Sequence, residues 1–373
     1  MLSTSTSSRD PLQATIEAPT AHRERAWTFA AATAVAGAAV LVFGMWLGGN
    51  LAQRKINGLL VGGTASFAEW SVSASKLVLN VASVGVIGML VGCLLLPDTD
   101  GGLGDPARRC LRTAGWLALV WGIANAALLM FSWSDVVAQP VTTLPITRLF
   151  TDSAATFPDA EAYISSTALA LVISGAIAVT TTRLGALIVL PLALYNLMPM
   201  ALQGHAAHST VLKFGLIIHI IAVSLWVGGL AALLIHARGE PAALAVALPR
   251  FSTLAVACFA AVAATGLISA WELLGRVSAA WTTRYGVTVM LKATALVTLG
   301  ILGWWQRRHT VHRVRSGKGR PARRAFIRLA AAEIVVMVAA VALAVALSRT
   351  ASPDTVLQHS AMSTRPEEVW EQS

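Results

Sequence analysis

The feature that most constrains this chain is a series of long apolar runs. They lie at about 26–48, 72–96, 112–134, 165–182, 184–203, 211–236, 251–274, 286–306 and 325–348. Each run is long enough, the fourth only just, to cross a hydrocarbon core of about 30 Å. Strand-like alternation is absent, and in lipid every backbone N–H and C=O must be satisfied internally. The runs therefore predict an all-α, polytopic membrane helix bundle of about nine transmembrane helices.

Composition and charge placement agree with a membrane protein. Only 12 % of the residues are charged and 56 % are hydrophobic, whereas a soluble chain carries roughly a quarter charged residues. The net charge of +10 comes from basic residues that fall on one side if the N-terminus is inside, above all in the stretch 307–328. This positive-inside pattern predicts an inner N-terminus and an outer C-terminus at the plasma membrane, and accounts for the basicity without nucleic acid. A competing interpretation is that 307–328 binds anionic lipid headgroups.

Two further readings concern the spans themselves. The first run is too long for the apolar region of a signal peptide, so we interpret it as an uncleaved span. The Gly-x-x-x-Gly spacings at Gly44–Gly48 and Gly88–Gly92 permit close contact between helices.

Residues 49–71 are expected to form an interfacial segment on the outer side, and 135–163 a second large outer loop. Cys93, Cys110 and Cys258 lie far apart, which favours buried or lipid-facing thiols over a disulfide framework.

The stretch from Tyr195 to Gly229 carries most of the side chains that suit a metal ion. Imidazole and thioether groups are ligands that copper accepts, and thioethers favour Cu(I). His219 falls well inside a predicted span, where an ionisable side chain is costly and points to function. Trp226 lies on nearly the same face of that helix. The candidate ligands are His205, His208, His219, Met198 and Met200.

Weaker candidates extend the same set along the predicted pathway. They are Met290, Met130, Met337 and Glu333. Packing is the competing interpretation for the methionines, and solvated loop positions for His205 and His208. Glu333 is expected either to form a local salt bridge or to be a step on an ion path, and Glu272 is placed to pair with Lys292.

Five segments in order resemble the copper resistance D (CopD) family. They are GHAAH at 204–208, HIIAVSLWVGGLAALL from His219, RFSTLAVACFAAVAATGLISAW from Arg250, RYGVTVMLKATAL from Arg284, and RRAFIRLAAAEIVVM from Arg323 with RTASP after it. His205 and His219 match the family positions best, and Trp226, Lys292 and Glu333 also match. The family often has two consecutive prolines where this chain has RTASP. The upstream segment from Trp70 to Gly92 resembles the N-terminal half of the longer actinobacterial members.

Composition, the apolar runs and the resemblance together predict a domain organisation. We expect a disordered cytoplasmic tail at 1–25, transmembrane helices with two larger outer loops at 26–190, a CopD-like transmembrane domain at 191–350, and a polar extracytoplasmic tail at 351–373. In many actinobacterial members a cytochrome oxidase assembly (CtaG-type) domain follows the CopD part. That second domain is not expected here, because the sequence ends after a short polar tail.

The resemblance also implies a function in copper handling. We expect copper, as Cu(I), to bind on the outer side and to move toward the cytoplasm, in a protein that is not an enzyme. No ATP-driven pump signature is visible, so transport would need either a gradient or delivery by an extracytoplasmic carrier protein as a partner. Two alternatives stay open: a haem-b electron-transfer protein, and a factor that delivers copper to a terminal oxidase. Haem needs axial histidines from facing helices, whereas His219 and His236 share one predicted span.

Overall fold

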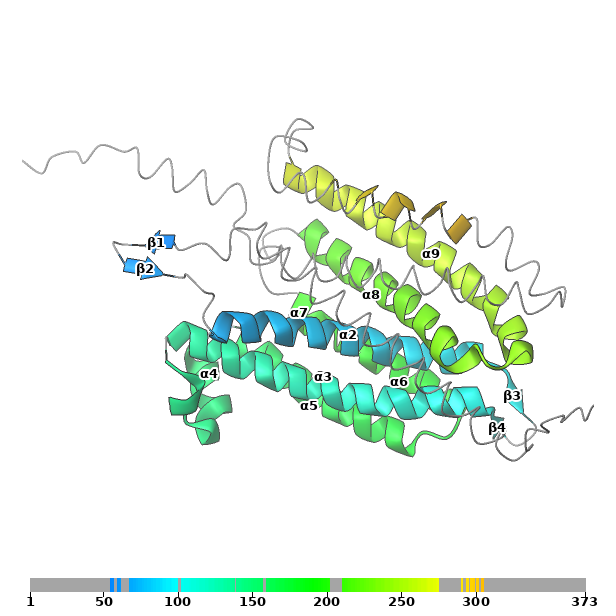
Figure 1. Ribbon diagram of the computed structural model, residues 1–373, viewed down its shortest axis with the longest axis horizontal. Coiled ribbons are helices and arrows are strands. Elements are labelled where there is room, and N and C mark those ends of the chain that lie inside the picture. Colours follow the sequence, from blue (N-terminus) through cyan, green and yellow to red (C-terminus); the bar gives the residue numbers. More distant parts are fainter. Residues whose placement is uncertain are drawn as a thin grey trace, which may run out of the picture.

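The computed structural model describes residues 54–56, 59–61, 67–99, 102–137, 139–156, 159–201 and 210–274, with short helical pieces between 290 and 304. These residues are mainly helical (Figure 1). The predicted spans at 26–48 and 325–348 lie outside the described residues, as do both predicted tails and the spacing Gly44–Gly48. The expectation of nine spans and its orientation therefore stay predictions.

Five helices in the described part of the chain are long and apolar enough to cross a membrane. They are α2 (Phe67–Leu95), α3 (Asp105–Val137), α5 (Ala160–Val179), α8 (Thr210–Ala232) and α9 (Pro241–Leu274). Helix α8 continues into a π-helical turn, Leu233–Ala237. Each helix overlaps one of the apolar runs, and α9 begins ten residues earlier than its run, with Pro241 at the first helical position, where its missing N–H costs nothing.

The predicted span 184–203 differs from the structure. Helix α6 (Arg183–Tyr195) has 13 residues, so it is about 20 Å long at 1.5 Å per residue. After a turn at Asn196, the four-residue helix α7 (Met198–Ala201) follows. Pro199 lies in the first turn of α7 and has no N–H to offer the carbonyl of Tyr195, four residues earlier.

Small elements occupy the connections. Strands β1 (Arg54–Ile56) and β2 (Leu59–Val61) form an antiparallel hairpin in the segment predicted to be interfacial. Strands β3 (Asp98–Thr99) and β4 (Gly102–Leu103) form another between α2 and α3, in which Gly102 has a φ of 111°. The predicted outer loop 135–163 contains the 3₁₀ turns η1 (Val141–Thr143) and η2 (Ile146–Arg148) and helix α4 (Leu149–Thr156).

The long helices lie side by side in the order α5, α3, α2, α8, α9, with α6 against α2 and α5 (Figure 1). Helix α2 is central because it packs on both α3 and α8. A Cβ atom added to Gly88 would overlap the backbone of Gly228, and one on Gly92 would lie 2.6 Å from the Cβ of Ala232. Both pairs have the same offset in sequence, so α2 and α8 run parallel. The prediction that Gly88–Gly92 permits close helix contact is confirmed.

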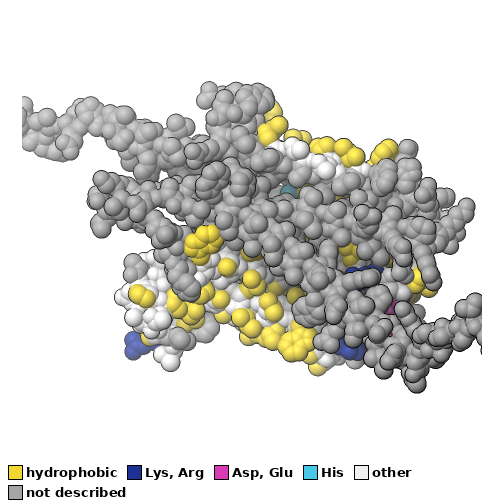
Figure 2. All heavy atoms as spheres, viewed as in Figure 1, with side chains coloured by type: hydrophobic (Ala, Val, Ile, Leu, Met, Phe, Trp, Pro, Cys, Tyr) yellow, Lys and Arg dark blue, Asp and Glu magenta, His cyan; other side chains and the backbone are white. Residues whose placement is uncertain are grey.

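Large apolar side chains cover the outside of the described bundle. Trp116 and Ile123 on α3, Ile188 on α6, and Leu267 and Trp271 on α9 are all exposed. Hydrophobic side chains dominate the described surface in Figure 2, between a few basic groups near its two ends. In water such a surface would favour aggregation, whereas lipid chains cover it at no cost.

Candidate metal site

His219 lies inside helix α8 and contacts helix α9. It is nine residues after Thr210, which is about 14 Å along the axis. Its Nδ1 atom is 2.9 Å from the Oγ1 atom of Thr265 on α9. Thr265 is 6 % exposed, and the imidazole is partly buried. The structure thus places His219 within a membrane-length helix, as predicted, and joins it to a hydroxyl that the sequence analysis did not single out.

The rest of the α8–α9 interface is apolar and aromatic. The rings of Trp226 and Phe259 meet edge to face with centroids 5.7 Å apart. Further along, a Cβ on Gly229 would lie 3.0 Å from the ring of Phe251. The residue numbers of the contacts on α9 decrease as those on α8 increase, so the two helices are antiparallel. Trp226 is buried two turns beyond His219, so a large apolar ring follows the imidazole along this interface.

The other predicted ligands fall into two groups, those that the structure describes and those outside the described residues. Met198 and Met200 belong to α7, which packs against α5, α6 and α8. Met130 on α3 packs against the hydrophobic core, and Met290 is exposed. His205, His208, Met337 and Glu333 lie outside the described residues. Among the described residues, no group of three or more His, Cys, Asp or Glu side chains is close enough to hold a metal ion.

The cysteines of the described helices are buried and free. Cys93, Cys110 and Cys258 form no disulfide. Cys110 packs against the backbone of α2, because its Sγ atom lies 3.3 Å from where a Cβ of Gly92 would be. The interpretation of these residues as buried thiols is confirmed.

A second polar contact is buried between α3, α5 and α6. The amide of Asn125 donates to the hydroxyl of Ser166 at 3.0 Å, and the amide of Asn196 donates to the backbone carbonyl of Ser166 at 3.3 Å. All three residues are 0 % exposed. The sequence did not identify Ser166 or Asn196 as buried polar residues. A polar residue inside or at the end of an apolar run was the available signal, but sequence alone does not pair them.

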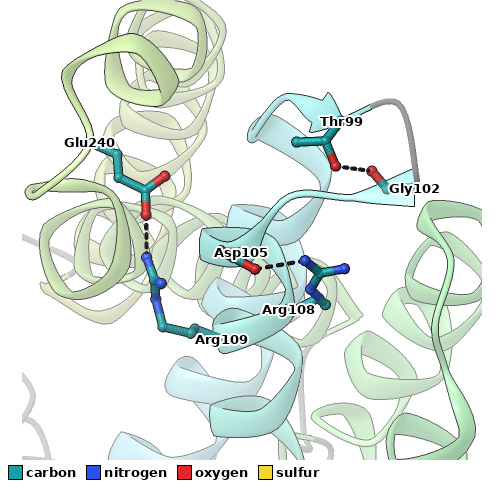
Figure 3. Close-up of polar contacts among 6 residues, drawn as sticks. All are labelled: Thr99, Gly102, Asp105, Arg108, Arg109 and Glu240. Atoms are coloured by element: carbon teal, nitrogen blue, oxygen red, sulfur yellow. Dashed lines mark hydrogen bonds and ion pairs between the residues drawn. The ribbon is translucent and has the colours of Figure 1, made fainter.

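Arginines gather at one end of the bundle, where α2 and α8 end and α3, α6 and α9 begin. Arg109 donates to Glu240 at 2.6 Å, and Asp105 pairs with Arg108 at 2.6 Å (Figure 3). Three arginines also donate to carbonyls at or near helix C-termini, where the dipole favours positive charge. They are Arg109 to His236, Arg183 to Leu96, and Arg250 to Leu95. We call this the arginine end.

His236 lies at the arginine end, in the π-helical turn that ends α8. Its Nε2 atom is 3.1 Å from the hydroxyl of Thr113 on α3. The described residues contain two histidines, His219 and His236, and both belong to the α8 segment. Since bis-histidine haem needs ligands from facing helices, the described residues offer no such pair.

Comparison with known families adds an independent observation. The family model for copper resistance protein D matches residues 245–347. The match covers less than a third of the chain and agrees with the resemblance to the CopD family described above. The match begins within α9 and takes in the family-like segments from Arg250, Arg284 and Arg323. The segments around His205 and His219 precede it. No curated protein and no solved structure matches the chain.

Family and fold together establish the broad class of this protein. It is a multi-pass membrane protein, part of which is similar to copper resistance protein D, and this class agrees with the predicted plasma-membrane location. The contact between His219 and Thr265 joins α8 to the helix at which the CopD match begins. Thr265 gave no signal in the sequence, because threonines in apolar helices usually bond to a carbonyl of their own helix.

Proposed function

We propose that this protein binds Cu(I) at a site that includes His219 and moves copper from the outer side toward the cytoplasm. The observation that carries the proposal is the placement of the His219 imidazole inside α8, held by Thr265. An ionisable group at this depth costs free energy, and in membrane helices such groups mark ion pathways. A neutral imidazole is also among the commonest metal ligands in proteins.

The chain around α7 supports a route from the bundle surface to His219. Helix α7 carries Met198 and Met200 and packs against α8. The eight residues between α7 and α8 include His205 and His208. These four candidate ligands therefore lie close in sequence to the start of α8, two to three turns before His219. Thioether and imidazole groups match the preference of Cu(I) for soft and borderline ligands.

The direction of transport is inferred from charge. The arginine end is the cytoplasmic end by the positive-inside rule, so α7 and the start of α8 face outward. Copper released by an extracytoplasmic carrier would then meet Met198 and Met200 first and His219 later. The positive charges of Arg109, Arg183 and Arg250 at the inner end are balanced in part by Glu240 and Asp98.

The test is a Cu(I) titration of the purified protein against a competing chelator. We expect His219→Ala to weaken Cu(I) binding by at least about tenfold, because it removes a ligand from a site of few ligands. His236→Ala is the matched control, since this histidine lies on the same helix but at the arginine end. The Cu(I) affinity of His236→Ala should equal that of the wild type. Equal Cu(I) affinity in wild type and His219→Ala would overturn the proposed site.

Transport itself is tested in cells. A strain that lacks the protein should accumulate less copper, and the wild-type gene should restore accumulation where His219→Ala does not. Normal cytoplasmic copper combined with lost terminal-oxidase activity would reject transport and assign a role in copper delivery. A reducible Soret band in the purified protein would instead indicate haem.

A further inference from the structure

We propose that Thr265 is a positioning residue for copper: its hydroxyl fixes the His219 imidazole in the Nδ1–H tautomer, so that Nε2 is the ligand atom. This inference rests on the proposed function, because it deepens the role of the same histidine. It assigns a role to a residue on α9, within the segment that matches the CopD family model.

The Thr265 hydroxyl has a single proton to donate. Its Oγ1 atom lies 2.7 Å from the carbonyl of Ala261 and 3.2 Å from that of Val262. A carbonyl oxygen can only accept, so this proton is directed along α9 to the backbone. In the contact with His219, therefore, Oγ1 is the acceptor. The Nδ1 atom of His219 must then carry a hydrogen and donate it across 2.9 Å.

The consequence for the ring follows from imidazole chemistry. A neutral imidazole has one N–H and one nitrogen with a lone pair. If Nδ1 carries the hydrogen, Nε2 carries the lone pair, which is the form that a metal ion needs. Metal-binding histidines usually donate their other ring N–H to a protein acceptor, which fixes both tautomer and ring orientation. Thr265 supplies that acceptor here.

Burial makes this hydrogen bond more selective than one on a surface. Thr265 is 6 % exposed, and Trp226 and Phe259 pack together on the same pair of helices. Water competes poorly for Nδ1–H in such surroundings, which strengthens the hydrogen bond to the hydroxyl. The bond also joins α8 to α9, and hence the orientation of the ring depends on the contact between these two helices.

The decisive comparison uses two substitutions at one position. Thr265→Val keeps the shape but removes the acceptor, and Thr265→Ser keeps the hydroxyl. We expect Thr265→Val to weaken Cu(I) binding about 10- to 100-fold, the usual effect of losing a partner behind a metal ligand, and Thr265→Ser to stay near wild type. Thr253→Val is the matched control, because Thr253 is also on α9 and also bonds to its own helix, at Pro249.

A spectroscopic readout separates positioning from packing. In metal-free protein labelled with ¹⁵N-histidine, the His219 signals are assigned as those lost in His219→Ala. Wild type and Thr265→Ser should show the Nδ1–H form, and Thr265→Val should show a mixture or the Nε2–H form. An Nε2–H form in the wild type would overturn the inference, even if Thr265→Val does not fold.

The outcomes also distinguish this inference from the proposed function. Normal Cu(I) affinity in Thr265→Val, with affinity lost in His219→Ala, would reject the role of Thr265 and leave the copper site standing. Equal losses in Thr265→Val and Thr265→Ser would assign Thr265 to packing alone. Normal affinity in His219→Ala would reject the copper site itself.

Discussion

Helix α8 packs against two neighbouring helices, α2 and α9, through different kinds of contact. Toward α2 it offers Gly228 and Ala232, and the backbones approach so closely that a Cβ on Gly228 would overlap the carbonyl of Val84. Toward α9 it offers His219 and Trp226, which meet a hydroxyl and an aromatic ring. One face is a close contact of small residues, and the other combines a polar pair with a large apolar pair.

The difference reflects how helices associate in lipid. Lipid chains are as apolar as leucine, so helix contacts depend on close packing and on hydrogen bonds between helices. The α2 face of α8 depends on close packing alone, whereas the α9 face combines packing with a hydrogen bond. A helix fixed rigidly to α2 provides a stable base from which His219 can be aimed at a partner on α9. The contrast predicts that changes on the α2 face affect folding, whereas polar changes on the α9 face affect copper.

The largest effect is expected on the α2 face. Gly228→Val adds a branched side chain where the α2 backbone leaves no room, and overpacking of this kind costs about 3 kcal/mol or more. We expect little folded protein, as measured by yield and gel filtration in detergent. Gly215→Ala is the control on the same helix, because no described atom lies within 4 Å of its added Cβ. Normal folding of Gly228→Val would show that the two helices can separate freely.

A smaller effect is expected from the aromatic pair on the α9 face. Trp226→Ala removes a buried ring from its contact with Phe259, and truncation of a buried Trp costs about 3 kcal/mol through lost contacts and a cavity. The midpoint of thermal unfolding in detergent should fall, while the protein still assembles. Trp226→Phe should recover most of the loss. If Trp226→Ala unfolds like the wild type, the α9 face depends on its polar pair alone.

The smallest effect is expected away from α8, at the other buried polar contact. Ser166→Ala removes the hydroxyl that accepts from Asn125 but keeps the carbonyl that accepts from Asn196. Hydrogen bonds between membrane helices are worth about 0.6 kcal/mol on average, so the unfolding midpoint should fall slightly. Ser165→Ala, at an exposed neighbour, is the control.

Copper binding extends the same comparison. Ser166→Ala should bind Cu(I) with wild-type affinity, since Asn125 and Asn196 both donate to Ser166 on α5 and neither bonds to a candidate ligand in any described contact. Weakened binding would connect this cluster to the copper route and remove the distinction between polar contacts that pack and polar contacts that position.

Several features of the fold were predictable because they depend on local sequence. The runs at 72–96, 112–134 and 211–236 became α2, α3 and α8, since length and hydropathy alone decide which segments can cross a bilayer. The small residues at Gly88 and Gly92 were recognised as a close-contact motif. The end of the fifth run was misjudged, because the chain turns between Tyr195 and Met198 while the composition stays apolar.

By itself, the sequence determined that this is a helical membrane protein, that His219 is embedded in one of its helices, and that the chain resembles the CopD family. Those conclusions depend on residue type and spacing along one segment. Only the tertiary structure decided that Gly88 meets Gly228 and that His219 meets Thr265. Contacts between distant segments depend on which helices pack together and in which register. The apolar composition of one segment does not specify which helix packs against it, or which residues of that helix it meets.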